Sequence, residues 1–248
     1  MIGIEDPEYA GQDNQAAAFE LYAYANDLAN QRREEPQDDL ITRLINAEII
    51  GDDGEPTVLN EQEIDGFMLL MAVAGNETTR NATSHGLWTL IEHPDQFDLL
   101  KSDTEGMIDT AVDEIVRFAS PVLHFRRTAT QDTEINGQKI NAGDKVVMWH
   151  VSANRDDSEF ENPFSLDIRR SPNNHVGFGG GGPHFCLGAN LARLELKIIF
   201  EELCRRMPDV SLDGEPSRLR SNFINGVKHM PISFTPGDRV NPEPNFDN

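Results

Sequence analysis

Residues 175–200, HVGFGGGGPHFCLGANLARLELKIIF, place one cysteine between a run of four glycines and an apolar-periodic segment. The periodic segment predicts a helix that begins just after Cys186. Glycines carry no side chain, so another group can approach the backbone of such a loop closely. The stretch therefore predicts a backbone loop that holds a thiol at the start of a helix.

The spacing of the two cysteines excludes a disulfide between them. Cys204 lies eighteen residues beyond Cys186 on the same predicted helix, which separates the two by roughly 27 Å. A disulfide needs Cα atoms about 4.4–6.8 Å apart. Cys204 is interpreted as a buried, inert thiol, and Cys186 requires a different role or none.

Three kinds of site have parts of this pattern. A dinucleotide site would use Gly177, Gly179 and Gly182 as G-x-G-x-x-G, but the preceding DIRRSPNNH is not the buried strand that this motif requires. A zinc site would use the histidines and cysteine of residues 175–186, but no second ligand pair has suitable spacing. Ligation of haem iron by the thiolate suits the low bulk of the loop and the N–H donors of a helix N-terminus. The alternative without a functional site is that Cys186 is a buried, inert cysteine.

At these residues the chain resembles a cytochrome P450, a haem-thiolate monooxygenase. The cysteine loop of that family reads F-x-x-G-x-H-x-C-x-G, and Gly182, His184, Cys186 and Gly188 fall in register with it. Phe178 stands one residue early, so the loop has one extra glycine. The sterol side-chain hydroxylases of actinobacteria and their relatives are similar in this longer form.

The resemblance implies haem b as the cofactor and Cys186 as its axial iron ligand. The other cofactor-binding residues that it implies are Arg127 and His184 at the haem propionates, with Phe178, Gly75, Gly182 and Gly188. It also implies a buried structural ion network of Glu114, Arg117 and Arg169.

A second motif lies in a predicted helix from Asn60 to His93. Ala74 to Thr79, AGNETT, matches the family's oxygen-activating pattern position by position. Glu77 and Thr78 are the predicted catalytic residues, because an acid beside a hydroxyl can relay protons. Gly75 would leave room for oxygen. Leu69 to Ala74 is continuously apolar, so this part of the helix is expected to be buried.

The order of elements predicts a mainly α fold with minor antiparallel β. The resemblance implies that this is the cytochrome P450 fold without its N-terminal portion. Residues 1–248 are expected to be the C-terminal part of a single cytochrome P450 domain. Its predicted parts are helices over 1–120, small hairpins and a meander over 121–174, the cysteine loop and its helix over 175–206, and a C-terminal hairpin region over 207–235.

Charge and hydropathy restrict the partners. The formal net charge of −22 makes nucleic acid a poor partner. The longest apolar run, FMLLMAVAG, is too short for a membrane span, and the N-terminus has no signal-peptide pattern. The protein is therefore expected in the cytoplasm. The acidic, lysine-poor composition is also compatible with a saline habitat.

The resemblance implies a monooxygenase that inserts oxygen from O2 into an unactivated C–H bond. Electrons derived from NAD(P)H would arrive through a ferredoxin reductase and a ferredoxin, which could dock on Arg193, Lys197, Arg205 and Arg206. An apolar substrate such as a sterol side chain is expected, with a role in cholesterol catabolism. The predicted substrate-facing residues are Met71, Ala74, Val122, Leu123, Phe125, Phe223 and Ile224.

Three alternatives stay open at this point. The chain could be an incomplete haem-binding protein without activity, because the resemblance begins near the middle of the family's length. It could instead hydroxylate a fatty acid or a terpene. An α-rich interaction protein without haem is the third alternative.

Overall fold

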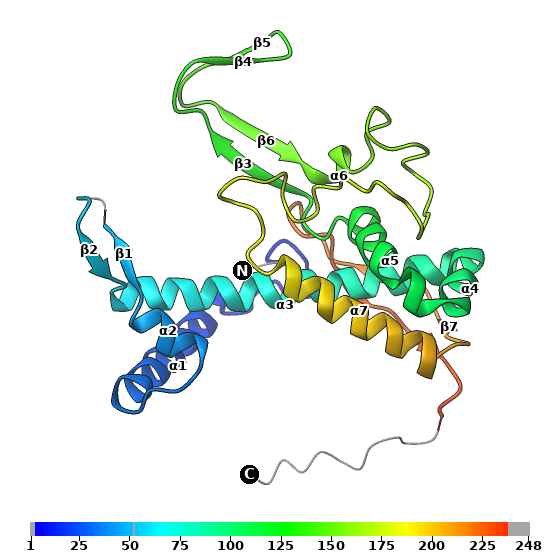
Figure 1. Cartoon of the computed structure of the whole chain (residues 1–248), viewed down its shortest axis with the longest axis horizontal. Coiled ribbons are helices and arrows are strands. Elements are labelled where there is room, and N and C mark those ends of the chain that lie inside the picture. The colour runs from blue at the N-terminus through cyan, green and yellow to red at the C-terminus, as the bar shows by residue number, and fades with distance from the viewer. Residues whose placement is uncertain (1–2, 52, 238–248) are drawn as a thin grey trace. The chain divides into compact units, whose positions relative to one another are not determined.

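The computed structural model describes residues 3–51 and 53–237 (Figure 1). Its helices are α1 (Asn14–Glu34), α2 (Leu40–Ile45), α3 (Glu61–Glu92), α4 (Pro94–Ser102), α5 (Thr104–Ala119), α6 (His150–Ala153) and α7 (Ala189–Arg206). Its strands are β1 (Glu48–Ile50), β2 (Pro56–Val58), β3 (His124–Thr128), β4 (Thr133–Ile135), β5 (Gln138–Ile140), β6 (Lys145–Trp149), β7 (Ser211–Leu212), β8 (Ser217–Arg218), β9 (Val227–His229) and β10 (Ile232–Ser233). The strands form antiparallel pairs, so the predicted class, mainly α with minor antiparallel β, is confirmed.

The chain divides into two compact units, and the boundary falls inside α3 between Glu77 and Thr78. The first unit holds α1, α2, the β1–β2 hairpin and the start of α3. The second holds the rest of α3 and all later elements. The predicted single domain stays a prediction.

In the first unit, the start of α3 is a capping box. The Glu63 N–H donates to Asn60 Oδ1 at 3.1 Å, and the Asn60 N–H donates to Glu63 Oε2 at 2.8 Å. These bonds satisfy two backbone donors that the first turn leaves unpaired. At its other end α3 stops at Glu92, before Pro94, so both predicted ends are confirmed within one residue.

The prediction that residues 1–120 are helical is wrong at one place. Within that range α2 ends at Ile45, and β1 pairs with β2 through Ile49 and Thr57. β-branched residues favour strands, and Gly54 supplies a positive φ of 84° in the connecting turn. A short apolar run such as this one does not by itself separate helix from strand.

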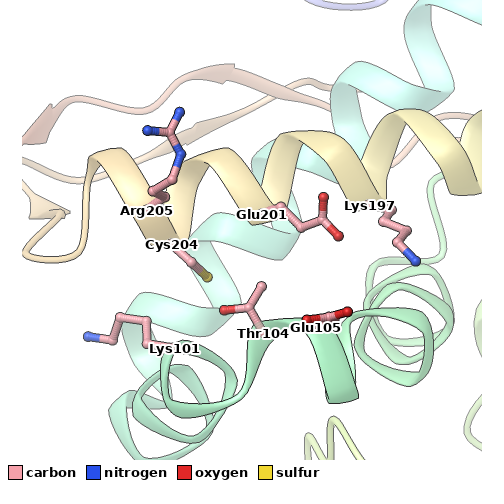
Figure 2. Close-up of a pocket in the computed structure, with 7 residues that line it drawn as sticks. All are labelled: Lys101, Thr104, Glu105, Lys197, Glu201, Cys204 and Arg205. Carbon is pink, nitrogen blue, oxygen red and sulfur yellow. The ribbon is translucent and has the colours of Figure 1, made fainter. Parts of the chain in front are cut away.

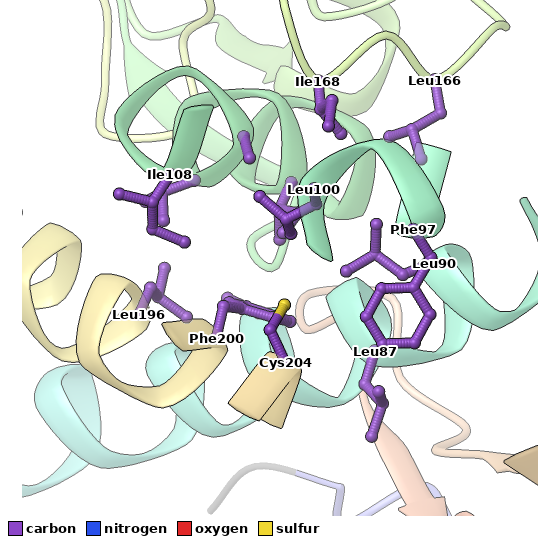
Figure 3. Close-up of a cluster of buried hydrophobic side chains, with 14 of the residues drawn as sticks. Leu87, Leu90, Phe97, Leu100, Ile108, Leu166, Ile168, Leu196, Phe200 and Cys204 are labelled. Atoms are coloured by element: carbon purple, nitrogen blue, oxygen red, sulfur yellow. The ribbon is translucent and has the colours of Figure 1, made fainter. Parts of the chain in front are cut away.

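The core of the second unit lies among α3, α4, α5 and α7 (Figure 3). Its fully buried side chains include Leu90, Leu100, Ile108, Leu196 and Phe200. α5 buries most of one side, as its strongly amphipathic pattern dictates. A Cβ at Gly86 would lie 2.5 Å from Phe200 Cζ and 2.7 Å from Ile115 Cγ2, so α3 approaches its neighbours where it has no side chain.

Polar contacts attach α3 to the β8–β9 pair. The buried His85 ring bonds through Nε2 to the Asn225 carbonyl at 3.0 Å. The Val227 N–H donates to Asn81 Oδ1, also at 3.0 Å. Because the acceptor is a carbonyl, His85 Nε2 carries the proton. These contacts fix the segment 223–227 in the second unit.

The predicted hairpins are partly confirmed. Asn136 and Gly137 both have positive φ, 49° and 80°, in the two-residue turn between β4 and β5. Ala142 and Gly143 do not form a hairpin turn, because β6 pairs with β3 and not with β5. In the part of the chain that the structure describes, no helix has the length and hydropathy to cross a bilayer.

Candidate functional site

The glycine loop closes on itself through backbone hydrogen bonds. The Cys186 N–H donates to the Phe178 carbonyl at 2.9 Å, which joins the two ends of the loop. Gly179, Gly181 and Gly182 between them have φ of 90°, 97° and 76°, a region that other residues rarely adopt. The loop thus needs glycine for its backbone path. The Cys186 side chain is exposed, two residues before Gly188 at the start of α7.

The surroundings of Cys186 are open and apolar. Its neighbours Phe185 and Leu187 are 48% and 82% exposed. A Cβ at Gly181, Gly182 or Gly188 would have no atom within 4 Å. A contiguous exposed apolar surface marks a binding site more often than scattered apolar side chains do. The geometry suits a flat apolar group laid against the loop, as the sequence predicts for Cys186.

The predicted propionate partners Arg127 and His184 are both exposed. Arg127 lies in β3 and is exposed, and its guanidinium donates to the Arg126 carbonyl at 3.1 Å. Within residues 3–51 and 53–237 no carboxylate pairs with it at 4 Å or less. His184 is exposed on the glycine loop. In a chain with 43 acidic residues, an arginine without an acidic partner is free to bind an anion.

Sequence reasoning missed His150, which the register of β3 and β6 places on the face of Arg127. Arg127 pairs with Val146 and Phe125 pairs with Met148, and directly opposed residues share a face. The same alternation brings the His150 ring to 5.6 Å from the Phe125 ring. Strand alternation from Arg127 was the signal that could have found it.

His150 has an unsatisfied polar atom. Its side chain is 7% exposed, and Nδ1 is buried without a hydrogen-bond partner among the described residues. Burial, together with the nearby positive charge of Arg127, lowers the pKa of His150, so the ring is neutral at neutral pH. A buried polar atom without a partner is costly, and a polar group of a bound molecule would satisfy it.

The predicted ion network is present, with one correction. Glu114 and Arg117 are fully buried and form two hydrogen bonds of 2.8 Å. The third member is Arg170, whose Nε lies 3.1 Å from Glu114 Oε2, and not Arg169. Arg169 is 64% exposed and lies 3.8 Å from Asp167. Residues 167–170 form a turn, so consecutive side chains point in different directions and only Arg170 reaches inward.

The oxygen-activating motif lies on α3 at the boundary of the two units. Glu77 and Thr78 are partly buried, whereas Ala74 and Gly75 are exposed. The expectation that residues 69–74 are buried is wrong: all six are partly or fully exposed, and Leu70 is 61% exposed. Six consecutive apolar residues cover every side of a helix, so one side stays open whichever side packs. The relay role of Glu77 and Thr78 stays a prediction.

Comparison with known proteins decides the family. Residues 6–208 match the family model described as Cytochrome P450. The chain is 50% identical over 237 residues to the methyl-branched lipid omega-hydroxylase of Mycobacterium tuberculosis. It is 48% identical over 234 residues to the steroid C26-monooxygenase of Rhodococcus jostii. This chain belongs to the cytochrome P450 family.

Solved P450 structures support the same family assignment. A Mycobacterium marinum cytochrome P450 in complex with pseudoionone has a TM-score of 0.86 and 47% identity, covering 94% of this chain and 56% of that one. The two curated P450 relatives are likewise covered only in part, over 54% and 48% of their lengths against 95% and 94% of this chain. The chain spans about half the length of the relatives it matches, as expected for the P450 fold without its N-terminal portion.

Haem b is the cofactor of this family, and the P450 chain has residues that fit it. An exposed thiol at Cys186 stands beside exposed apolar side chains and open glycines. Arg127 and His184 offer positive or polar groups for two propionates. The unsatisfied nitrogen of His150 lies on the same face as Arg127. Cys186 would ligate the iron. Arg127, His184 and His150 would bind the propionate edge of the haem.

The P450 fold brings together two predicted substrate-facing segments that lie a hundred residues apart. Val122 bridges Ile224, and the Leu123 N–H donates to the Phe223 carbonyl at 2.8 Å. The rings of Phe125 and Phe223 meet edge to face at 5.6 Å. Ile224 is only 2% exposed and packs inward. Of these two neighbours, Phe223 is therefore the one whose side chain can face a substrate. Met71 and Ala74 belong to the first unit, and their role stays a prediction.

Every cation of the suggested basic patch is ion-paired. Arg193 lies 2.8 Å from Asp113, Lys197 lies 3.0 Å from Asp109, and Arg205 and Arg206 both pair with Glu202. Each cation of the predicted docking patch thus has an acidic partner. Exposed ion pairs are weak, so a partner could displace them. Because Arg205 and Arg206 share one carboxylate, these ion pairs leave one of the four positive charges unbalanced.

A groove of about 620 Å³ lies between α7 and the α4–α5 pair (Figure 2). Its lining residues are Lys101, Thr104, Glu105, Lys197, Glu201, Cys204 and Arg205. Burial raises the pKa of the Cys204 thiol, which keeps it protonated, as expected of an inert cysteine. The charged lining does not suit an apolar substrate. The groove lies toward the opposite end of α7 from Cys186 and is a separate feature.

Proposed function

We propose that this protein is a haem-dependent monooxygenase that hydroxylates an unactivated C–H bond of an apolar lipid. The observation that carries the proposal is the exposed Cys186 thiol at the end of a glycine loop with open space and apolar neighbours. The relatives named as an omega-hydroxylase and a C26-monooxygenase support it.

When bound, haem supplies the oxygen-activating chemistry, which no amino-acid side chain can perform. Cys186 would provide the sulfur ligand at the N-terminal end of α7, where the helix dipole favours negative charge. Arg127 and His184 would hold the propionates. The carboxyl of Glu77 and the hydroxyl of Thr78 pass protons toward the oxygen site, because an acid and a hydroxyl on adjacent residues can form a relay.

Two features select an apolar substrate in this proposal. Leu123, Phe125 and Phe223 form an apolar surface on the face that also bears Arg127. The named relatives act on a methyl-branched lipid and on a steroid. We infer a branched lipid chain or a steroid side chain as the substrate, with hydroxylation at the chain end. For a steroid this corresponds to a role in cholesterol catabolism.

The reaction needs two electrons, and the given sequence contains no flavin or nicotinamide motif. A ferredoxin and its NAD(P)H-dependent reductase are the proposed donors, and the cytoplasm is the proposed location. A ferredoxin would have to displace the acidic partners of Arg193 and Lys197.

The test is turnover under 18O2. The haem-loaded chain is incubated with a ferredoxin, its reductase and NADH, and offered a methyl-branched fatty acid or a 3-keto steroid. The proposal predicts a hydroxylated product that carries one atom of 18O, lost in Glu77→Gln. If haem binds but neither substrate gives product, the chain is a haem-binding protein without activity and the proposed function is wrong for it.

A further inference from the structure

A buried histidine outside the proposed mechanism contacts the base of the glycine loop. The His175 side chain is 3% exposed. Its Nδ1 accepts the Gly177 N–H at 3.1 Å, and its Nε2 lies 3.4 Å from Asp113 Oδ1. An acceptor nitrogen carries no proton. The ring is therefore held as the tautomer with its proton on Nε2, which faces the Asp113 carboxylate.

The same carboxylate joins α5 to α7. Arg193 Nε donates to Asp113 Oδ1 at 2.8 Å. Although burial raises it, the hydrogen bonds from His175 and Arg193 hold the pKa of Asp113 below its ordinary value. Asp113 thus stays ionised and can orient both groups. A carboxylate that orients a histidine ring is a common way to fix a tautomer.

Phe178 is held between these two groups. Its ring lies 5.7 Å from the His175 ring, and the Arg193 guanidinium carbon lies 4.5 Å from its centroid. The carbonyl of Phe178 accepts the Cys186 N–H. A continuous series of contacts therefore runs from Asp113 through His175 and Phe178 to the backbone of Cys186.

The backbone next to Phe178 has little freedom. A Cβ at Gly177 would lie 2.6 Å from Val116 Cγ1 and 3.0 Å from His175 Nδ1. By contrast, a Cβ at Gly181 or Gly182 would have no atom within 4 Å. The two ends of the loop are thus fixed, and the glycines between them are free to take up the extra residue noted in the sequence.

We propose that His175 is a positioning residue for Cys186. Its Nδ1 fixes the Gly177 N–H, and with it Phe178, so that the extra glycine bulges between residues 179 and 182 and the sulfur keeps its place. Asp113 acts through His175 by holding the tautomer. The proposal rests on the proposed function only for its effect on haem, because the loop geometry is a property of the chain itself.

Two substitutions of His175 separate the effect of its hydrogen bond to Gly177 from the effect of its size. His175→Asn places an amide oxygen near the position of Nδ1 and retains the acceptor for Gly177. His175→Gln places its polar end near Nε2 and loses that acceptor. The control for Asp113→Leu is Asp109→Leu, because Asp109 pairs with Lys197 across the same two helices without contacting the loop.

The first experiment measures amide hydrogen exchange at Cys186 in the chain without haem. His175→Gln and Asp113→Leu are expected to speed exchange about tenfold, the equivalent of one hydrogen bond. His175→Asn and Asp109→Leu are expected to leave it within about twofold. Equal effects of the Asn and Gln variants, or no effect of either, would overturn the proposal. So would a nitrogen NMR spectrum of the unchanged chain that places the His175 proton on Nδ1.

The second experiment measures the reduction potential and the carbon-monoxide spectrum of the reduced, haem-loaded chain. His175→Gln is expected to convert more than about half of the thiolate-type band to the band of a neutral ligand and to shift the potential, and His175→Asn to restore both toward the unchanged chain. Normal spectra in both variants would overturn the positioning role. If the unchanged chain lacks the thiolate band, the proposed function fails, and the exchange experiment still decides the role of His175.

Discussion

The buried charges of the ion network are the residues on which stability depends most. Glu114 is fully buried and accepts hydrogen bonds from Arg117, Arg170 and Asn173. Removing one partner of a buried charge costs about 3–5 kcal/mol, because the remaining charge stays in the interior. Arg117→Met should lower the free energy of unfolding by that amount in urea titrations. An unchanged unfolding midpoint would contradict this assignment.

The correction from Arg169 to Arg170 has its own test. Arg170→Met removes a bond to a buried carboxylate and should destabilise the chain by about 2 kcal/mol. Arg169→Met is the matched control, because its side chain is largely exposed, and should change stability by less than about 0.5 kcal/mol. Both are compared by urea unfolding. If Arg169→Met proved the costlier change, the placement of the two arginines would be wrong.

His85 makes stability depend on pH. Burial, with the positive charge of Arg218, lowers the pKa of His85 to about 4 from its ordinary 6.5. The unfolded chain then binds more protons than the folded one between these values, so stability is full above pH 6.5 and is lost as pH falls toward 4. The free energy of unfolding should be about 2 kcal/mol lower at pH 5 than at pH 7 from this residue alone.

The control for His85 is a variant that does not titrate. His85→Gln should remove this part of the pH dependence, although the carboxylates still contribute theirs. Urea unfolding at pH 5, 6 and 7 measures the slope in both chains. Equal slopes would show that His85 is not held neutral.

At the scale of elements, two glycines of α3 should respond in opposite ways. Gly86→Ala would push a methyl group into Phe200 and Ile115 and should cost about 1–3 kcal/mol. A Cβ at Gly75 has no atom within 4 Å, so Gly75→Ala should stabilise the helix by about 0.5–1 kcal/mol. In the proposed function the same methyl group occupies the space for oxygen and lowers turnover.

Gly66 is the control on the same helix. A Cβ there also meets nothing within 4 Å, so Gly66→Ala should stabilise α3 as Gly75→Ala does. Unlike Gly75→Ala, it should leave product formation unchanged. Thermal unfolding and turnover measure the two effects, and equal turnover of the Gly66 and Gly75 variants would remove Gly75 from the oxygen site.

The sequence predicts an element well where local chemistry sets its ends, and less well where only an apolar pattern is available. The ends of α3 were predictable, because Asn60, Glu63 and Pro94 act through local chemistry. The β1–β2 hairpin was not, because Ile49 and Ile50 continue an apolar pattern that suits a helix as well as a strand. Arg169 was predicted in place of Arg170 as the third member of the ion network. An irregular turn has no periodicity that shows which side chain points inward.

At the scale of the molecule, the net charge of −22 has a measurable effect. Like charges repel one another more in the compact state than in the unfolded chain. Salt shortens the Debye length from about 10 Å at 0.1 M to about 3 Å at 1 M. The temperature of unfolding should therefore rise between 0.1 and 1 M KCl. A fall or no change, with sucrose at equal osmolality as reference, would contradict this explanation.

The family was predictable from sequence because its motifs are short and chemically demanding. AGNETT, the pair of Glu114 and Arg117, and the cysteine loop each use residue types that suit oxygen, a buried ion network or haem. His150 and His175 were missed as functional candidates, because their roles depend on strand register and on a carboxylate sixty-two positions away in sequence, Asp113. Such pairings arise from the tertiary fold and leave no local pattern.

The most direct test of the account is the carbon-monoxide spectrum of the reduced chain loaded with haem. The account predicts the long-wavelength band of a thiolate ligand in the unchanged chain and in Cys204→Ser, and its loss in Cys186→Ser. The same band in Cys186→Ser, or no such band in the unchanged chain, would contradict ligation by Cys186.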